Sequence, residues 1–172
     1  WSAQNNALEL HTPQWQEPDR CDRLVVDLDP GPGAGLGLCC ETALLVADYL
    51  RADGLRAQPV TSGSKGMQLY VPFAEPMDAP AVLNYARSMA GDLAAKHSGL
   101  IVATMSKSKR EQRVFIDWSQ NNPAKTTITP YSLRGKNLPY AATPVTWDEV
   151  TEGLTEQFLF SETLARLQEY GD

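Results

Sequence analysis

The sequence reads LVVDLDPGPG from Leu24 to Gly33, an apolar strand pattern that carries two carboxylates and stops at a Pro/Gly-rich turn. Side chains of a strand alternate between its faces, so Asp27 and Asp29 share one face while Leu24 and Leu28 occupy the other. Two like charges this close repel, and in a half-buried setting a divalent cation between them keeps both ionised. Hard oxygen ligands favour magnesium or manganese. The alternative is a strand whose polar face meets only solvent.

Apolar periodicity from this strand onward predicts the order strand, helix, strand, strand, helix, strand. This is the split β-α-β arrangement, so we expect an α+β fold with an RRM-like βαββαβ core and a mixed or antiparallel sheet flanked by helices. A basic connection before the last strand predicts a hairpin arm. The expected strands are 23–29, 56–61, 68–71, 100–104 and 113–117, the expected helices are 38–52 and 79–97, and the arm is 106–112.

The ends of the chain carry weaker patterns. Residues 1–15 predict a short strand, with Leu8 and Leu10 around Glu9 and His11, that stops at Pro13, and residues 17–22 predict a polar loop. After position 136, the run Thr146-Trp-Asp-Glu149 fits a capping box that opens a short helix, and a final helix is expected near the C-terminus. The aromatic residues of this part are expected to cover the core: Trp147, Phe158 and Phe160.

The expected topology brings a third carboxylate to the first strand. The crossover rule places the last strand beside the first one, so Asp117 is expected next to Asp27 and Asp29. Alternation puts Phe115 and Arg113 on the same face as Asp117. Two metal ions bridged by carboxylates is the arrangement of polymerase-type phosphoryl transfer, and it would account for all three acids.

Length and composition fit a single domain over residues 1–172, with 42% hydrophobic and 21% charged residues. No long apolar run or signal-peptide pattern points to a membrane or to secretion. The three cysteines lack Cys-x-x-Cys spacing, which fits a reducing cytoplasm, and Cys39 and Cys40 are expected in the core. Because Trp1 opens the chain without an initiator Met, we expect a fragment, with 137–172 as its acidic, helical C-terminal tail.

The net charge of −6 conceals an uneven distribution. Residues 105–136 contain seven basic and two acidic side chains, whereas the segments on both sides are acidic. A basic face on an acidic body is what a polyanionic partner such as nucleic acid or a triphosphate requires, although such a face often only contacts solvent.

A glycine-containing turn, Ser62-Gly-Ser-Lys-Gly66, joins two of the expected strands. Successive N–H groups in a tight turn can form an anion-binding concavity, and Lys65 can neutralise phosphate charge. The turn is not a Walker A loop. A hairpin turn chosen only for its flexibility is the alternative interpretation.

Four blocks, in this order, carry a family resemblance: ALELHTPQW from Ala7, VDLDPG from Val26, TSGSKG from Thr61, and VFIDWSQN from Val114, which continues through KTTITPYSLRG from Lys125. Together they resemble the polymerase domain of bacterial DNA ligase D, which belongs to the archaeo-eukaryotic primase superfamily. The resemblance runs from the start of the chain to about Gly135. From this resemblance we expect that on the order of a hundred residues precede this region in the family and lie outside the chain.

The resemblance implies a role for each matching residue. It implies two catalytic divalent cations, manganese or magnesium, on Asp27, Asp29 and Asp117. It implies nucleotide binding by His11, Ser62, Lys65, Gln120 and Arg134, and DNA binding by Lys107, Lys109, Arg110 and Arg113. Gln68 stands where the family usually has histidine, and we expect it to face the nucleotide phosphates without a charge.

The implied reaction is addition of nucleotides, often ribonucleotides, to DNA 3′ ends in gap filling and double-strand break end joining. The implied partners are DNA ends, a nucleoside triphosphate, Ku and a DNA ligase. The resemblance also implies a monomer that is located in the bacterial cytoplasm and associated with the nucleoid. Two alternatives stay open. Asp27-Leu-Asp29 also resembles the nucleophile strand of haloacid-dehalogenase-type phosphatases, and the basic segment also suits a non-catalytic nucleic-acid-binding module.

Overall fold

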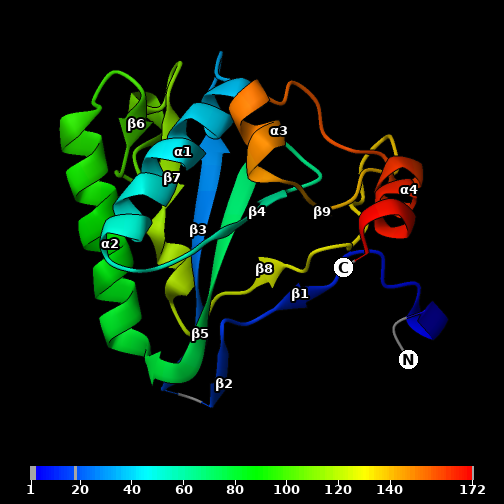
Figure 1. Ribbon diagram of the computed structural model, residues 1–172, viewed down its shortest axis with the longest axis horizontal. Coiled ribbons are helices and arrows are strands. Elements are labelled where there is room, and N and C mark those ends of the chain that lie inside the picture. The colour runs from blue at the N-terminus through cyan, green and yellow to red at the C-terminus, as the bar shows by residue number, and fades with distance from the viewer. Residues whose placement is uncertain (1–2, 18, 172) are drawn as a thin grey trace.

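A computed structural model describes residues 3–17 and 19–171, so Trp1 lies outside the described residues. Its central element is a seven-stranded sheet in the order β6-β7-β3-β5-β4-β9, with β2 also paired to β3 (Figure 1). The sheet is mixed, because β6 and β7 run parallel while the other pairs are antiparallel. Its strands are β2 (Trp15–Glu17), β3 (Arg20–Pro30), β4 (Gln58–Thr61), β5 (Met67–Asp78), β6 (Ile101–Val102), β7 (Val114–Asp117) and β9 (Thr143–Pro144).

Helices α1 (Leu36–Ala52) and α2 (Ala79–Lys96) pack on one face of this sheet. The side chains of Leu24, Val26 and Leu28 join apolar side chains of both helices in the main core. Helix α2 follows β5 directly, and the Asp78 carboxylate caps it by accepting a hydrogen bond from the Ala81 N–H at 2.9 Å. Because β3 buries its leucines under the helices, its other face is left for the carboxylates.

The predicted RRM-like core is confirmed. Strand β3, α1, β4, β5, α2 and β7 occur in this order as βαββαβ, with β6 and η2 inserted between α2 and β7, and β7 pairs with β3 as expected. Strand β7 is not at the edge of the sheet, since β6 pairs with its far side. Cys39 and Cys40 lie in the core of α1, as predicted.

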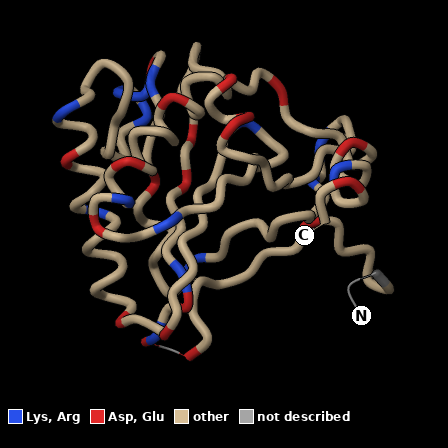
Figure 2. Tube along the Cα trace, in the orientation of Figure 1, with Lys and Arg blue, Asp and Glu red and all other residues tan. Residues whose placement is uncertain are grey.

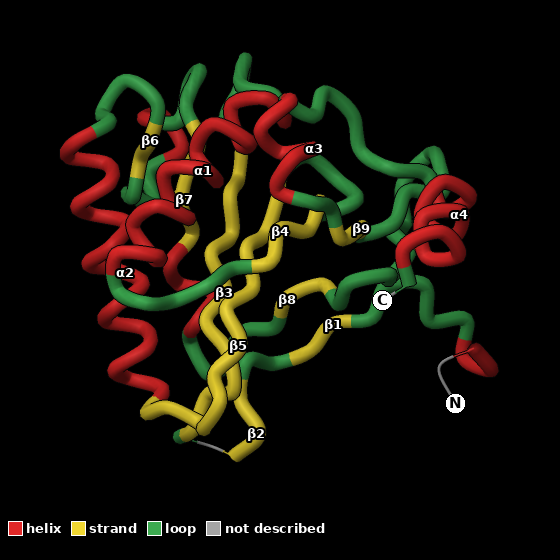
Figure 3. Tube along the Cα trace, viewed as in Figure 1, coloured by secondary structure: helices red, strands yellow, loops and turns green. Residues whose placement is uncertain are grey.

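A separate two-stranded sheet lies on the carboxylate side of the molecule. It consists of β1 (His11–Thr12) and β8 (Thr127–Ile128), which run side by side away from the main sheet (Figure 3). Ile128 packs with Val60 in a small second apolar cluster, against which Tyr70 is placed. This cluster holds the small sheet against the open face of β4 and β5.

The prediction of a hairpin arm between 100–104 and 113–117 is wrong. Strands β6 and β7 are parallel, and the connection between them contains the short 3-10 helix η2 (Lys107–Lys109). Parallel neighbours need a crossover, and this one folds over the end of β3. The Gln112 N–H donates to Pro32 O at 2.7 Å, and the Gly31 N–H donates to Arg113 O at 2.9 Å.

Two N-terminal predictions are partly wrong. A short strand that ends before Pro13 is present, but it begins only at His11, so Leu8 and Leu10 precede it, and both are exposed. The segment predicted as a polar loop contains the start of β3, where Arg20 and Cys21 pair with both β2 and β5. No described helix is long and apolar enough to cross a membrane.

The C-terminal part contains more than helices. The predicted capping box of Thr146 and Glu149 opens α3 (Trp147–Glu152), and α4 (Phe160–Tyr170) follows, but β9 comes before both and extends the main sheet next to β4. Trp147 and Phe158 pack against the core as expected. Phe160 does not, since it is 46% exposed. Two further 3-10 helices are η1 (Ala3–Asn5) and η3 (Trp118–Asn121).

Candidate active site

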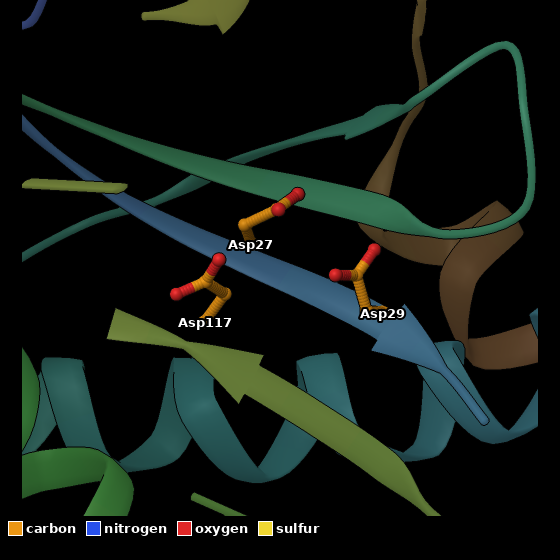
Figure 4. Close-up of side chains that lie close together, drawn as sticks. All are labelled: Asp27, Asp29 and Asp117. Atoms are coloured by element: carbon orange, nitrogen blue, oxygen red, sulfur yellow. The ribbon is translucent and has the colours of Figure 1, made fainter. Parts of the chain in front are cut away.

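Three carboxylates meet where β3 and β7 pair. Asp27 lies opposite Asp117 in the antiparallel register, and Asp29 lies two residues further along β3. Figure 4 shows the three side chains projecting from the same side of the two strands. Each offers an oxygen atom within 4.8 Å of those of the other two. The shared strand face predicted from the sequence is therefore present.

Burial and mutual repulsion make this group costly to ionise. Asp27 is buried, and its pKa is raised to about 7, first by desolvation and then by the negative charge of Asp29. The pKa of Asp29 is also raised, by desolvation and by the charge of Asp117, against the opposing effect of Arg110. Three oxygen donors that repel one another suit a divalent cation, so the residues present fit the metals expected from the sequence.

Asp117 is held by the turn that follows it. Its Oδ1 accepts hydrogen bonds from Ser119 N at 3.0 Å and from Ser119 Oγ at 2.5 Å, which caps η3. Lys125 Nζ lies 3.5 Å from Asp117 Oδ2 and also contacts Ser119 Oγ. Ser119 and Lys125 were missed as site residues, because a 3-10 turn after a strand has no periodic sequence signature.

Two amide side chains bracket Asp27. Gln120 Nε2 lies 3.4 Å from both Asp27 Oδ2 and Asp117 Oδ2, so it bridges the two strands. Gln68 lies opposite Asp27 on β5, and its Nε2 donates to Asp27 Oδ1 at 3.1 Å. Gln68 was expected to face the nucleotide phosphates, whereas its donor group is directed to a carboxylate, and its side chain shares a strand face with Tyr70.

The turn from Ser62 to Gly66 connects β4 to β5 and satisfies part of its own backbone. The N–H groups of Ser64 and Gly66 each donate to Ser62 Oγ at 3.2 Å. The expected concavity of N–H groups is therefore partly filled by the Ser62 hydroxyl oxygen. Gly63 has φ +65°, and a Cβ there would lie 2.6 Å from Arg134 Cγ, so only glycine lets this turn contact Arg134.

A cavity of about 230 Å³ opens beside the carboxylates. It gathers every nucleotide-binding residue proposed from the sequence, together with two of the acids. These residues are His11, Asp27, Asp29, Ser62, Lys65, Gln68, Gln120 and Arg134. Their positions come from β1, β3, the turn between β4 and β5, β5 itself, η3 and the segment after β8.

Glu9 contacts both His11 and Arg134 of this cavity and was missed from the sequence. Its Oε2 lies 3.3 Å from His11 Nε2, while its Oε1 accepts from the Gly135 N–H at 2.8 Å. The hydrogen bond from Gly135 is the main reason why the pKa of Glu9 is lowered. Arg134 Nε is 3.6 Å from Glu9 Oε1 and has no hydrogen-bond partner among the described residues. The position of Glu9 two residues before His11 was the sequence pattern that could have indicated their contact.

The proposed DNA-binding residues lie on the connection between β6 and β7 but differ in their contacts. Lys107 and Lys109 are exposed in η2, whereas Arg113 reaches back to Ser98 O at 3.3 Å. The Arg110 guanidinium stacks on Phe115, 3.6 Å from the ring centre, and its charge acts on Asp29. Figure 2 shows Lys and Arg on several parts of the trace, among Asp and Glu, and the basic face expected from residues 105–136 stays a prediction. Lys125 and Arg134 instead pair with acids of the site.

Comparisons with known proteins agree on one family. The family model described as LigD, primase-polymerase domain, matches residues 1–172. The chain is 47% identical to the multifunctional non-homologous end joining protein LigD of Mycolicibacterium smegmatis over 100% of the chain and 23% of that protein. It is 29% identical to the bifunctional non-homologous end joining protein LigD of Bacillus subtilis over 99% of the chain and 28% of that protein. The chain thus spans about a quarter of the length of these curated relatives.

The fold has a close counterpart among solved structures. The polymerase domain of Mycobacterium tuberculosis ligase D in complex with DNA superposes with a TM-score of 0.95 at 43% sequence identity. The match covers 100% of this chain and 63% of that one.

Proposed function

The chain belongs to the LigD primase-polymerase domain family, and on this premise we propose that it adds nucleotides, ribonucleotides included, to DNA 3′ ends in gap filling and end joining. The observation that carries the proposal is the group Asp27, Asp29 and Asp117 beside a cavity with cationic side chains. A triphosphate that arrives with divalent cations requires both features. The family assignment also removes the phosphatase alternative.

The three carboxylates would hold two divalent cations, manganese or magnesium, which when bound stabilise the attacking and leaving oxygens of phosphoryl transfer. The side chains of this chain orient the reactants around them. Lys65, His11 and Arg134 bind the triphosphate, and their position on the wall of the cavity beside the carboxylates supports this role. The Ser62 oxygen accepts from its own turn, which leaves the hydroxyl proton for a phosphate oxygen.

In this proposal Gln120 holds two of the metal-binding carboxylates and also contacts the nucleotide. Its amide bridges Asp27 and Asp117 from the turn after β7, on the wall of the nucleotide cavity. It therefore fixes the spacing of the two acids and contacts the incoming nucleotide.

DNA is the proposed second substrate. The solved counterpart is described as a complex with DNA, and here the exposed Lys107 and Lys109 project from a loop whose Arg110 reaches Phe115, the neighbour of Asp29. We assign backbone contacts to the two lysines, and to Arg110 and Arg113 a position close to the 3′ end. Ku and a DNA ligase as partners, a monomeric state and a place at the bacterial nucleoid in the cytoplasm belong to the same proposal.

The test is primer extension on gapped DNA with manganese and a ribonucleoside triphosphate. The unsubstituted chain should extend the primer, and Asp29→Asn should abolish extension, because it removes one metal ligand. Glu41→Gln is the matched control, since Glu41 is an exposed carboxylate on α1 and should not matter. Full extension by Asp29→Asn would contradict the proposal.

Primer extension together with a DNA-binding measurement in chelator addresses the remaining alternative. A non-catalytic module would bind gapped DNA equally well with a chelator present and would add no nucleotide. That pair of results for the unsubstituted chain would replace the proposed reaction by DNA binding alone.

A further inference from the structure

Gln68 does not meet the site as a free amide. It is 6% exposed on β5, directly opposite Asp27, and its Nε2 donates to Asp27 Oδ1 at 3.1 Å. An amide has one donor end and one acceptor end, so this hydrogen bond turns Oε1 away from the carboxylate. Whatever contacts Oε1 therefore decides whether the donor end stays on Asp27.

Tyr70 supplies that contact. Its hydroxyl lies 3.0 Å from Gln68 Oε1 and 2.7 Å from Ile128 O. Both neighbours are acceptors, so the phenol proton is shared between them and Tyr70 acts as a donor. Burial raises the pKa of Tyr70, which keeps this proton in place. The Gln68 amide is thus oriented by the hydroxyl of Tyr70, a residue that does not line the nucleotide cavity.

The hydrogen bonds on Asp27 leave a defined part of it open. Gln68 occupies Oδ1 and Gln120 approaches Oδ2, one amide on each oxygen. A carboxylate has about four lone-pair positions, so each oxygen keeps one for a cation. Partners that hydrogen-bond to a metal ligand orient it and commonly change metal affinity by about 10–100-fold when they are removed.

We propose that Tyr70 is a positioning residue of the metal site, acting through the Gln68 amide to hold the Asp27 carboxylate in the orientation that binds metal. The inference rests on the proposed function, because it assigns the metals to Asp27, Asp29 and Asp117. It also gives Gln68 a different task from the phosphate contact expected from the sequence: the amide supports a metal ligand.

The experiment measures Mn²⁺ affinity by calorimetry, independently of turnover. Tyr70→Phe keeps the ring but removes the hydroxyl, and should weaken Mn²⁺ binding by about tenfold. In primer extension the same variant should lower kcat and leave KM for the nucleotide nearly unchanged. Tyr85→Phe is the matched control, since it removes a hydroxyl that donates to Asp53 Oδ2 at 2.8 Å, between the helices on the other side of the sheet. It should leave Mn²⁺ affinity unchanged.

A double-mutant cycle tests the route through Gln68. In a Gln68→Leu background the amide is absent, so Tyr70→Phe should cause no further loss of Mn²⁺ affinity. Additive losses would show that Tyr70 acts by another route, and unchanged affinity in Tyr70→Phe alone would make its role purely structural. Either result would overturn the inference. If the unsubstituted chain and Asp29→Asn bound Mn²⁺ equally, the proposed metal site itself would fail.

Discussion

The side-chain amide of Asn121 takes the place of a neighbouring strand beside Val25. Its Oδ1 accepts from Val25 N at 2.9 Å, and its Nδ2 donates to Val25 O at 2.8 Å. Strand β7 ends at Asp117, so beyond that point β3 would otherwise have two free backbone groups on this side. The chain can therefore leave the sheet at η3, where Gln120 turns to the carboxylates, without leaving β3 unsatisfied.

Asn121→Ala should lower the free energy of unfolding by roughly 2–3 kcal/mol, because it leaves a buried N–H and a buried C=O without partners. Urea denaturation followed by circular dichroism measures this. The neighbouring Asn122→Ala removes only an exposed hydrogen bond that Asn122 Oδ1 accepts from the Ala124 N–H, and it should lower the free energy of unfolding by well under about 1 kcal/mol. Equal losses in the two variants would mean that the amide of Asn121 does not replace a strand.

Asp27→Asn should change how the stability of the metal-free protein depends on pH. The pKa of Asp27 is raised from an ordinary value of 3.8 to about 7, so the folded protein binds this proton more tightly than the unfolded chain does. Stability is then highest below pH 4 as far as this group is concerned, and it falls as pH rises toward 7. Removing the charge should make the variant more stable at pH 8, on the order of 1–3 kcal/mol.

Thermal unfolding at pH 4.5 and 8 in the presence of chelator tests this expectation. Asp48→Asn removes an exposed carboxylate of α1 and should keep the pH dependence of the unsubstituted protein. Saturating Mn²⁺ should stabilise the unsubstituted protein at pH 8 much more than Asp27→Asn. A variant with the same pH dependence as the unsubstituted protein would contradict the assigned burial of this charge.

Replacing both Lys107 and Lys109 with alanine should flatten the salt dependence of DNA binding by about two units of slope, because each lysine is expected to neutralise one phosphate. These two residues are better targets than Arg110, because Arg110 stacks on Phe115 and donates to Met105 O at 3.1 Å. Fluorescence anisotropy between low and moderate salt measures the slope. Lys96→Ala, at the exposed end of α2, is the control. An unaltered slope in the double variant would leave η2 as a solvated loop.

Gly63→Ala should raise KM for the nucleotide by displacing Arg134. The added Cβ would lie 2.6 Å from Arg134 Cγ and 2.7 Å from Ala141 C, and the backbone has φ +65°. Gly54→Ala separates backbone strain from the displacement of Arg134. Gly54 has φ +76° but no atom within 4 Å of an added Cβ. Both variants should lose about 1–2 kcal/mol from backbone strain. Only Gly63→Ala should also affect nucleotide binding, and equal KM values would refute the role of this close approach.

Alternation along strands accounts for the parts of the site that the sequence predicted. Asp27 and Asp29 share a face because they are two residues apart, and the βαββαβ order then places Asp117 opposite Asp27. The same pattern specifies which face a residue takes but not the direction of its strand. This is why β6 was expected in a hairpin with β7 and is instead parallel to it.

The residues that support the carboxylates could not be predicted in this way. Ser119 and Lys125 reach Asp117 only because η3 turns the chain out of the sheet. Glu9 reaches Arg134 across a sequence separation of more than a hundred residues, through the pairing of β1 with β8. Gln68 could be placed on its face, but the direction of its amide depends on Tyr70, a contact that no sequence period encodes.

The small sheet of β1 and β8 should unfold locally more easily than the seven-stranded sheet, so two parts of the site differ in local stability. The carboxylates belong to the seven-stranded sheet, whereas His11 sits on a ladder of two residue pairs, His11 with Ile128 and Thr12 with Thr127. So short a ladder is marginal by itself. Its amides should therefore exchange with solvent deuterium through fluctuations that leave β3 protected. The wall of the cavity around His11 can thus fray and re-form beside a group of carboxylates that stays in place.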